Sequence, residues 1–197
     1  MTNFPNRHSI RLPNYDYSSE GYYFVTMCTQ KRKEMFGKIT KHKMILNNIG
    51  KIIKNHWELL PKRFPIKLDL FQIMPNHLHG IIQIVVKPKS PAVGVSFMKP
   101  DNLKSKTPID ILKSNHHMGL INQTPTLGHI IRHFKGITSK KIHEQGFNIK
   151  IWQRNFHEHI IRNENKLNKI RQYIKLNPTI WQRDKNHPIN ISQLNHV

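Results

Sequence analysis

Two apolar stretches separated by a two-residue turn constrain the fold of this chain most. The stretch from 67 to 74 (KLDLFQIM) and the stretch from 77 to 86 (HLHGIIQIVV) are rich in apolar and β-branched residues, and only Pro75 and Asn76 lie between them. Two such stretches around a short turn are typical of a β-hairpin. The pattern therefore predicts two neighbouring antiparallel strands.

Other segments show the periodicity of further strands and helices. The sequence predicts a first strand over 22–30 and a helix over 41–60, which Pro61 and Pro65 end. A second helix is predicted over 127–146, followed by a short extended stretch over 148–161. A last helix is predicted from Glu164 to about Asn177, capped by Asn163 and stopped by Pro178. This order predicts an α+β fold of ferredoxin-like type, with one antiparallel sheet and helices over it. We expect one domain over residues 1–197, with a flexible insertion at 87–125, where prolines, lysines and serines dominate.

The charge balance points to a polyanionic partner. Lys and Arg number 32 against 11 Asp and Glu, which gives a net charge of +21. A domain this basic most often binds nucleic acid, because each neutralised phosphate releases counterions. An anionic membrane is the weaker alternative, and no stretch approaches the ~18 apolar residues that a membrane span needs. The absence of a secretory signal pattern and the single cysteine, Cys28, favour a cytoplasmic protein.

His77 and His79 flank Leu78 at the start of the second predicted strand. Because side chains alternate along a strand, both imidazoles point to one face while Leu78 points to the core. Two imidazoles at this spacing can bind a divalent metal ion. The alternative is a pair of ordinary surface histidines, since the chain has 14 histidines.

A second histidine pair, His157 and His159, flanks Glu158. If both of these imidazoles faced a site, Glu158 would have to point to the core, which is costly unless the carboxylate is paired. We therefore favour the first pair as metal ligands and interpret the second pair as surface or phosphate-facing groups.

Tyr173 and Asn177 are four residues apart on the last predicted helix, so they lie on one helix face. One interpretation is a tyrosine nucleophile with a third metal ligand one turn later. The other is an aromatic residue at the edge of a helix interface, without a chemical role.

Three motifs, MPNHLHG (74–80), IWQRNFHEHIIRNE (151–164) and IRQYIKLNP (170–178), together resemble the single-tyrosine HUH transposases, in particular the branch of REP-associated tyrosine transposases. The likeness extends to the N-terminal SIRLPNYDYSSEGYYFVTMCTQKRKEMFG and to RHFKGITSKKI (132–142). It implies an HUH-nuclease type of fold in which His77 and His79 are metal ligands, Asn177 is a polar ligand and Tyr173 attacks DNA. It also implies a covalent 5′-phosphotyrosine, a free 3′ hydroxyl and strand transfer on hairpin-bearing single-stranded DNA.

The expected cofactor is Mg²⁺ or Mn²⁺. Two imidazoles and a carboxamide are neutral, so they leave the full charge of the ion available to a phosphate, and open coordination positions suit these ions better than a closed zinc site. Zinc is the alternative metal.

The expected partner is single-stranded or stem-loop DNA, bound by a monomer or a homodimer. Single strands bend into clefts and stack on aromatic or arginine planes. Candidate phosphate-binding residues, each of which is alternatively a solvated charge, are Arg132, Lys135, Lys140, Lys141, Arg154, Arg162 and Lys169.

Two other functions remain open at the level of sequence. The first is a noncatalytic nucleic-acid-binding module, which would lack metal binding by the histidine pair. The second is a replication initiator or relaxase of the HUH superfamily, against which the short chain argues.

Overall fold

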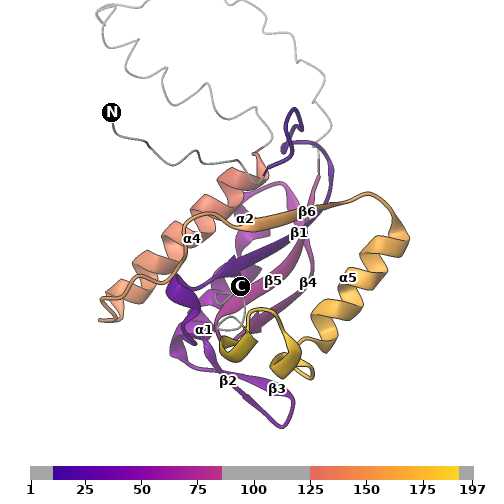
Figure 1. Ribbon diagram of the computed structural model, residues 1–197. Helices are drawn as coiled ribbons and strands as arrows, with labels where there is room; N and C mark the ends of the chain where they lie inside the picture. The colour runs from indigo at the N-terminus through magenta and orange to yellow at the C-terminus, as the bar shows by residue number, and fades with distance from the viewer. Residues whose placement is uncertain (1–10, 86–124, 191–197) are drawn as a thin grey trace, which may run out of the picture.

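The computed structural model describes residues 11–85 and 125–190. A four-stranded sheet forms its centre (Figure 1), and every pair of neighbouring strands is antiparallel. The order across the sheet is β4 (Ile66–Met74), β5 (His77–Ile84), β1 (Gly21–Cys28) and β6 (His157–Ile161). β4 and β5 are the two predicted strands, and Met74 pairs with His77 across the turn. Except for Pro125, the insertion expected at 87–125 lies outside the described residues.

The helices fall where the ferredoxin-like order requires them. α1 (Asn48–Glu58) and the short α2 (Leu60–Arg63) connect β1 to β4, and α4 (Leu127–Glu144) connects β5 to β6. α5 (Glu164–Leu176) follows β6, and two single-turn 3₁₀ helices, η1 (Gln30–Arg32) and η2 (Trp181–Arg183), lie after β1 and after α5. The α+β ferredoxin-like prediction is confirmed. No helix within the described ranges combines the length and the hydropathy that crossing a membrane requires.

The helix predicted over 41–60 begins later than expected. Its first third belongs to a two-stranded ribbon, β2 (Gly37–Thr40) and β3 (Lys43–Leu46), and α1 starts only after Asn47, whose side chain accepts a hydrogen bond from the Gly50 amide. Lys41 and His42 both have positive φ (48° and 60°), which makes a tight turn between the strands. Pro61 lies in the first turn of α2 rather than after a helix end. Short apolar runs fit both periodicities, so spacing alone could not separate ribbon from helix.

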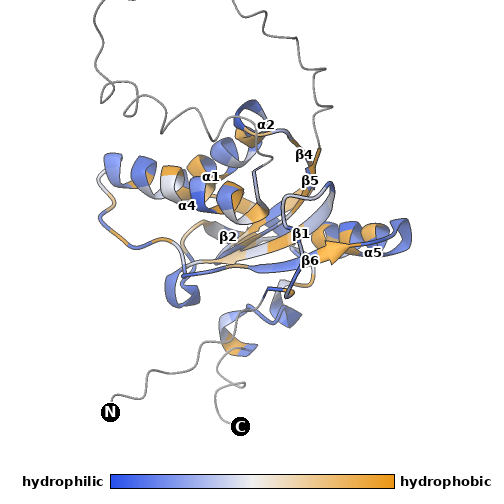
Figure 2. Ribbon diagram, turned by 90° about the horizontal axis from the view of Figure 1, so that it is seen from above, coloured by the Kyte–Doolittle hydropathy of each residue, from blue (hydrophilic) through white to orange (hydrophobic). Residues whose placement is uncertain are grey.

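The main hydrophobic core lies between one face of the sheet and the pair α1 and α4 (Figure 2). Leu78, Ile82 and Ile84 of β5 belong to this core, as the alternation along the strand predicted. Gly80 lies between them, directly under the Trp57 ring of α1. A Cβ atom at Gly80 would lie 2.4 Å from that ring, so only glycine permits this close approach.

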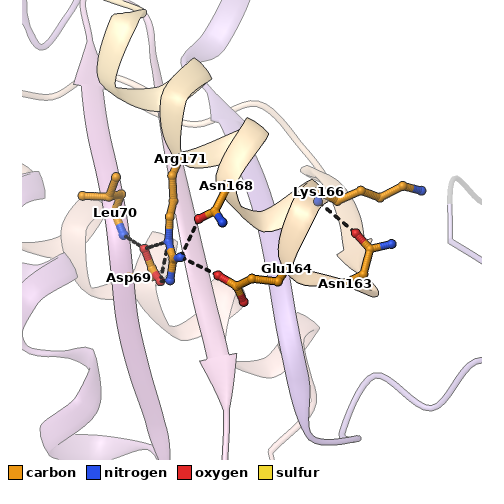
Figure 3. A network of polar contacts seen from close by, with 7 residues as sticks. All are labelled: Asp69, Leu70, Asn163, Glu164, Lys166, Asn168 and Arg171. Carbon is orange, nitrogen blue, oxygen red and sulfur yellow. Dashed lines mark hydrogen bonds and ion pairs between the residues drawn. The ribbon is translucent and has the colours of Figure 1, made fainter.

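A second, smaller core lies on the opposite face of the sheet, under α5. Its buried residues are Ile81, Ile161, Leu167 and Ile174. The side chain of Asn163 caps α5 by accepting a hydrogen bond from the Lys166 amide, as predicted. Farther along α5, Arg171 reaches across to Asp69 of β4 (Figure 3), with 2.6 Å between Nη2 and Oδ2. The helix that carries Tyr173 is therefore held by apolar packing and by an ion pair.

Candidate active site

β5 places His77 and His79 on the face of the sheet that α5 covers. Both side chains are buried, with exposed fractions of 0% and 1%. They lie opposite Cys28 and Thr26 of β1, and their ring centroids are 4.4 Å apart. The predicted common face is confirmed, and burial rules out the alternative of two surface histidines.

Hydrogen bonds to the Nδ1 atoms fix the orientation of both imidazoles. Asn76 Oδ1 lies 2.8 Å from Nδ1 of His77. Because an amide oxygen can only accept, Nδ1 donates, and Nε2 of His77 keeps its lone pair. That Nε2 atom is buried and has no hydrogen-bond partner among the described residues. Thr26 Oγ1 lies 2.8 Å from Nδ1 of His79, which leaves Nε2 of His79 facing the site.

α5 brings Tyr173 and Asn177 to these imidazoles. The Tyr173 hydroxyl lies 3.1 Å from Nε2 of His79, and the two rings are 5.2 Å apart between centroids. Asn177 follows one turn later, at the end of the helix, and is fully buried. The four-residue spacing thus has the predicted consequence that both side chains reach the same place.

Asp184 is a member of the cluster that the sequence did not reveal. The carboxylate is 4% exposed, and its Oδ2 accepts hydrogen bonds from the Tyr173 hydroxyl (3.1 Å) and from Nδ2 of Asn177 (2.7 Å). Ligand atoms of His77, His79 and Asp184 all lie within 4.8 Å of one another. The only signal in the sequence is an isolated acid in the basic stretch WQRDKNHP, seven residues after Asn177.

The segment that carries Asp184, residues 181–190, is called the closing segment here because it covers the site. Asn186 accepts a hydrogen bond at its main-chain oxygen from Nδ2 of Asn76 (2.7 Å), and its side-chain oxygen accepts another from Arg32. The Trp181 ring packs against His77 at 5.8 Å between centroids. These contacts connect the closing segment to the turn between β4 and β5, and through it to His77.

Burial sets the protonation state of the site. It lowers the pKa of His77 to about 3, with a further contribution from the nearby charges of Arg32 and Lys185. Burial, and next the neighbouring His77, hold the pKa of His79 well below its usual value. Burial and the Asp184 carboxylate raise the pKa of Tyr173. Near neutral pH both imidazoles are therefore neutral and able to bind a metal, and the phenol keeps its proton.

The donor atoms of the cluster fit a divalent cation. Nε2 of His77 and Oδ1 of Asn177 are both buried and lack a hydrogen-bond partner in the described part of the chain. Buried polar atoms without partners are rare, and an ion bound beside these two atoms would satisfy both of them. Two imidazole nitrogens with carboxylate and carboxamide oxygens are a donor set that divalent first-row metals and Mg²⁺ accept. The group formed by His77, His79 and Asp184 can hold a metal ion, and Asn177 offers a further oxygen beside it.

The predicted phosphate-binding residues do not form one continuous surface. Four of them, Arg132, Lys135, Lys140 and Lys141, lie on α4, which covers the face of the sheet opposite the site. Lys135 donates to the main-chain oxygens of Gln153 and Asn155, and Lys140 and Lys141 lie near Glu144 at 4.0 and 2.7 Å. Arg154, Arg162 and Lys169 are exposed near β6 and α5. A DNA-binding role for these seven residues remains a prediction.

The second histidine pair lies at the edge of the sheet. β6 pairs with β1, with His157 opposite Thr26, and this register puts His157 on the same face as His79. Both histidines of the pair are exposed, in agreement with the surface interpretation. Glu158 points to the other side, where its side chain is 2% exposed and lies 3.9 Å from Nε of Arg11.

Comparisons with known proteins agree with the fold. An uncharacterized protein of Haemophilus influenzae is 36% identical over 181 residues, which cover 91% of this chain and 92% of that protein. A solved structure of a REP-associated tyrosine transposase bound to a REP hairpin matches with a TM-score of 0.52 and 16% identity, over 86% of this chain and 72% of that one. No protein-family model matches the sequence. The structural likeness shows that this chain has a transposase-type fold.

Proposed function

We propose that this chain, which belongs to the same family as the Haemophilus influenzae protein, is a metal-dependent nuclease that cuts and joins single-stranded DNA through Tyr173. One observation carries the proposal: the Tyr173 hydroxyl lies 3.1 Å from both His79 and Asp184, inside a buried group of metal-binding side chains. A tyrosine in a structural role does not require a buried imidazole and a carboxylate in contact with its hydroxyl.

The residues of the cluster have separate roles in this proposal. His77 and His79 would hold the cation through Nε2, and Oδ1 of Asn177, which has no hydrogen-bond partner among the described residues, would complete the set. The cation, when bound, neutralises a phosphate oxygen and so lowers the electrostatic barrier to attack by a nucleophile. Neutral imidazoles leave most of the ion's charge for that purpose.

Tyr173 is the proposed nucleophile. Its oxygen forms a bond to phosphorus while the bond from phosphorus to the 3′ oxygen breaks, and the leaving 3′ oxygen takes up a proton from water, which leaves a 5′-phosphotyrosine and a free 3′ hydroxyl. Two groups lie within hydrogen-bonding distance of the phenol and can take its proton. Because Nε2 of His79 serves as a ligand, we assign the proton to Asp184 Oδ2. The reverse reaction with another 3′ hydroxyl joins strands without an external energy source.

Charge and the structural likeness support the choice of substrate. The net charge of +21 favours a polyanion, and the transposase of similar fold was solved with a DNA hairpin. Arg32 and Lys185 lie close enough to lower the pKa of His77. Two positively charged side chains are therefore near the place where a phosphate would bind. The described residues of a single chain supply the tyrosine and both imidazoles, so we propose a site formed within one subunit.

The experiment tests for the covalent intermediate. Purified protein is incubated with hairpin-bearing single-stranded DNA and Mg²⁺ or Mn²⁺, and the products are separated on a denaturing gel. We expect a protein–DNA adduct with the wild-type chain, none with Tyr173→Phe, and unchanged DNA binding by that variant. Tyr22→Phe is the matched control, because Tyr22 packs in the same small core away from the metal-binding atoms. An adduct that survives in Tyr173→Phe, or a wild-type chain without adduct in either metal, would refute the proposal.

A further inference from the structure

The ribbon formed by β2 and β3 has one inner and one outer face. Ile39, Met44 and Leu46 are partly buried, and Met44 and Leu46 pack against the main core. The register pairs Lys38 with Ile45 and Thr40 with Lys43, so these four exposed side chains share the outer face. In Figure 1 the ribbon projects from the lower end of the molecule.

The outer face of the ribbon, together with the turn at its tip, carries positive charge that no neighbouring acidic side chain in the described part of the chain neutralises. Lys38, Lys41 and Lys43 are exposed, and none of them forms an ion pair with another described residue. No acidic residue occurs between Glu34 and Glu58. This contrasts with the lysines of α1 and α4, where Lys54 pairs with Glu58 and Lys141 pairs with Glu144.

Hydrogen bonds connect the base of the ribbon to the turn that precedes His77. The amides of Met35 and Phe36 both donate to the main-chain oxygen of Pro75, at 2.8 and 3.0 Å. On the other side, the Asn47 amide donates to the main-chain oxygen of Phe36 at 3.1 Å. Gly37 closes the base, because a Cβ atom there would lie 2.0 Å from the Ile45 oxygen and φ is 142°. The ribbon therefore has a defined position relative to the metal-binding cluster.

We propose that the outer face of this ribbon binds the duplex stem of a hairpin DNA. The inference rests on the function proposed above and adds to it the element that contacts the stem. A two-stranded ribbon fits the major groove of a duplex, whose width is about 12 Å. The side chains also favour a duplex over a single strand, because single-strand binding relies on aromatic stacking and the ribbon from Gly37 to Leu46 has no Phe, Tyr or Trp.

This arrangement gives the ribbon a second effect. A stem held on a ribbon that is anchored at Pro75 lies at a set distance from His77, two residues later. The distance between the ribbon and His77 then determines how many nucleotides of single strand lie between the stem and the cleaved phosphate. In this way the ribbon selects the position of the cut.

The experiment compares two DNA molecules in binding assays without metal. One is a hairpin with a single-stranded extension, and the other is the extension alone. The variant is Lys38→Gln with Lys41→Gln and Lys43→Gln, which removes three charges and keeps the side-chain length. We expect hairpin affinity to fall about 10- to 100-fold and the salt dependence to lose a slope of about two to three, while binding of the extension changes less than about two-fold.

The matched control removes the same charge elsewhere, by Lys54→Gln with Lys62→Gln and Lys67→Gln. Lys62 and Lys67 lie near the far end of β5, away from His77. The inference is wrong if the control loses as much hairpin affinity as the ribbon variant, if both DNA molecules lose equally, or if the wild-type chain does not prefer the hairpin. Because no cleavage is measured, failure of Tyr173 to form an adduct does not alter these outcomes.

Discussion

Asn76 lies directly behind His77 and has three contacts that a shorter side chain cannot replace. Its Oδ1 accepts from Nδ1 of His77, and its Nδ2 donates to the main-chain oxygens of Arg32 and Asn186. Groups in this position orient a metal-binding imidazole and determine which nitrogen is available. Asn76 is therefore a positioning residue for the proposed site.

We expect Asn76→Ala to weaken Mn²⁺ binding by about 10-fold or more, because Nε2 of His77 is no longer held as the free nitrogen. Isothermal titration calorimetry measures this affinity. Asn76→Asp keeps the acceptor for Nδ1, so metal affinity recovers even though the donors of the amide are lost. Asn55→Ala, an exposed position on α1, is the control and leaves the affinity unchanged. Equal affinities of Asn76→Ala and the wild-type chain would show that Asn76 does not orient His77.

Lys135 provides a pH-dependent test of the main core. Burial lowers its pKa to about 8, while the same lysine in the unfolded chain has a pKa of 10.5. Between these two values the unfolded state binds more protons than the folded state, so the free energy of unfolding rises with pH in this window. We expect the wild-type chain to gain about 1 kcal/mol relative to Lys135→Met between about pH 7.5 and about pH 9.5, since partial exposure reduces the full effect. Urea unfolding at both pH values measures this gain, and parallel profiles would contradict it.

The sequence revealed part of the site for a physical reason. His77 and His79 lie two residues apart on one strand, and Tyr173 and Asn177 lie four apart on one helix, so local periodicity is enough to group each pair. Asp184 belongs to no periodic element, and its position depends on the 3₁₀ turn at 181–183 and on the contacts of the nearby Asn186 with Asn76 and Arg32. Such long-range contacts leave no pattern in a single sequence.

At the scale of elements, α5 is the helix on which the proposed chemistry depends. Asp69 lies at an irregularity of β4 between Leu68 and Phe71, and there its carboxylate accepts from both Nε and Nη2 of Arg171. This ion pair lowers the pKa of Asp69. Tyr173 follows Arg171 by two residues, so the pair helps to fix the position of the phenol.

We expect Asp69→Asn to reduce the rate of adduct formation about five-fold and to leave hairpin binding unchanged. Loss of a partly exposed ion pair costs about 1 kcal/mol, which corresponds to this change in rate when the helix moves away from its working position. A time course of adduct formation under single-turnover conditions measures the rate. Lys54→Gln, which removes an exposed ion pair with Glu58 on α1, is the control. A rate equal to that of the wild-type chain would mean that apolar packing alone positions α5.

Prediction of elements succeeded where length or capping signals supported the periodicity, as in α5 with Asn163 and Pro178. It failed at 41–46, where Ile45 and Ile49 fit a helical period although a turn with two positive φ values intervenes. The Lys41–His42 turn lacks glycine, and this absence removed the usual signal for a hairpin.

At the scale of the whole molecule, charge and fold act together. The net charge of +21 favours association with polyanions, while the sheet separates the main core from the face with the metal-binding cluster. The order of elements predicted the fold, because it is summed over many residues, while the DNA partner that the composition favours remains a prediction. The division into two unequal cores became visible only with the strand register.

We expect the affinity of the wild-type chain for hairpin DNA to fall about 100-fold or more when salt rises from about 50 to about 200 mM, because several phosphates are neutralised at once. Fluorescence anisotropy over a salt series measures the slope. A matched uncharged peptide nucleic acid hairpin is the control and should show little salt dependence. A decrease of less than about five-fold for DNA would contradict binding through phosphate contacts.

The order of synthesis has a consequence for the closing segment. The strand with His77 and His79, together with α1 and α4 of the main core, leaves the ribosome before residues 181–190 do. A nascent or prematurely terminated chain can therefore fold its sheet while it still lacks Asp184 and the clamp of Asn186. The proposed site is therefore incomplete until residues 181–190 have been synthesised and have folded against it.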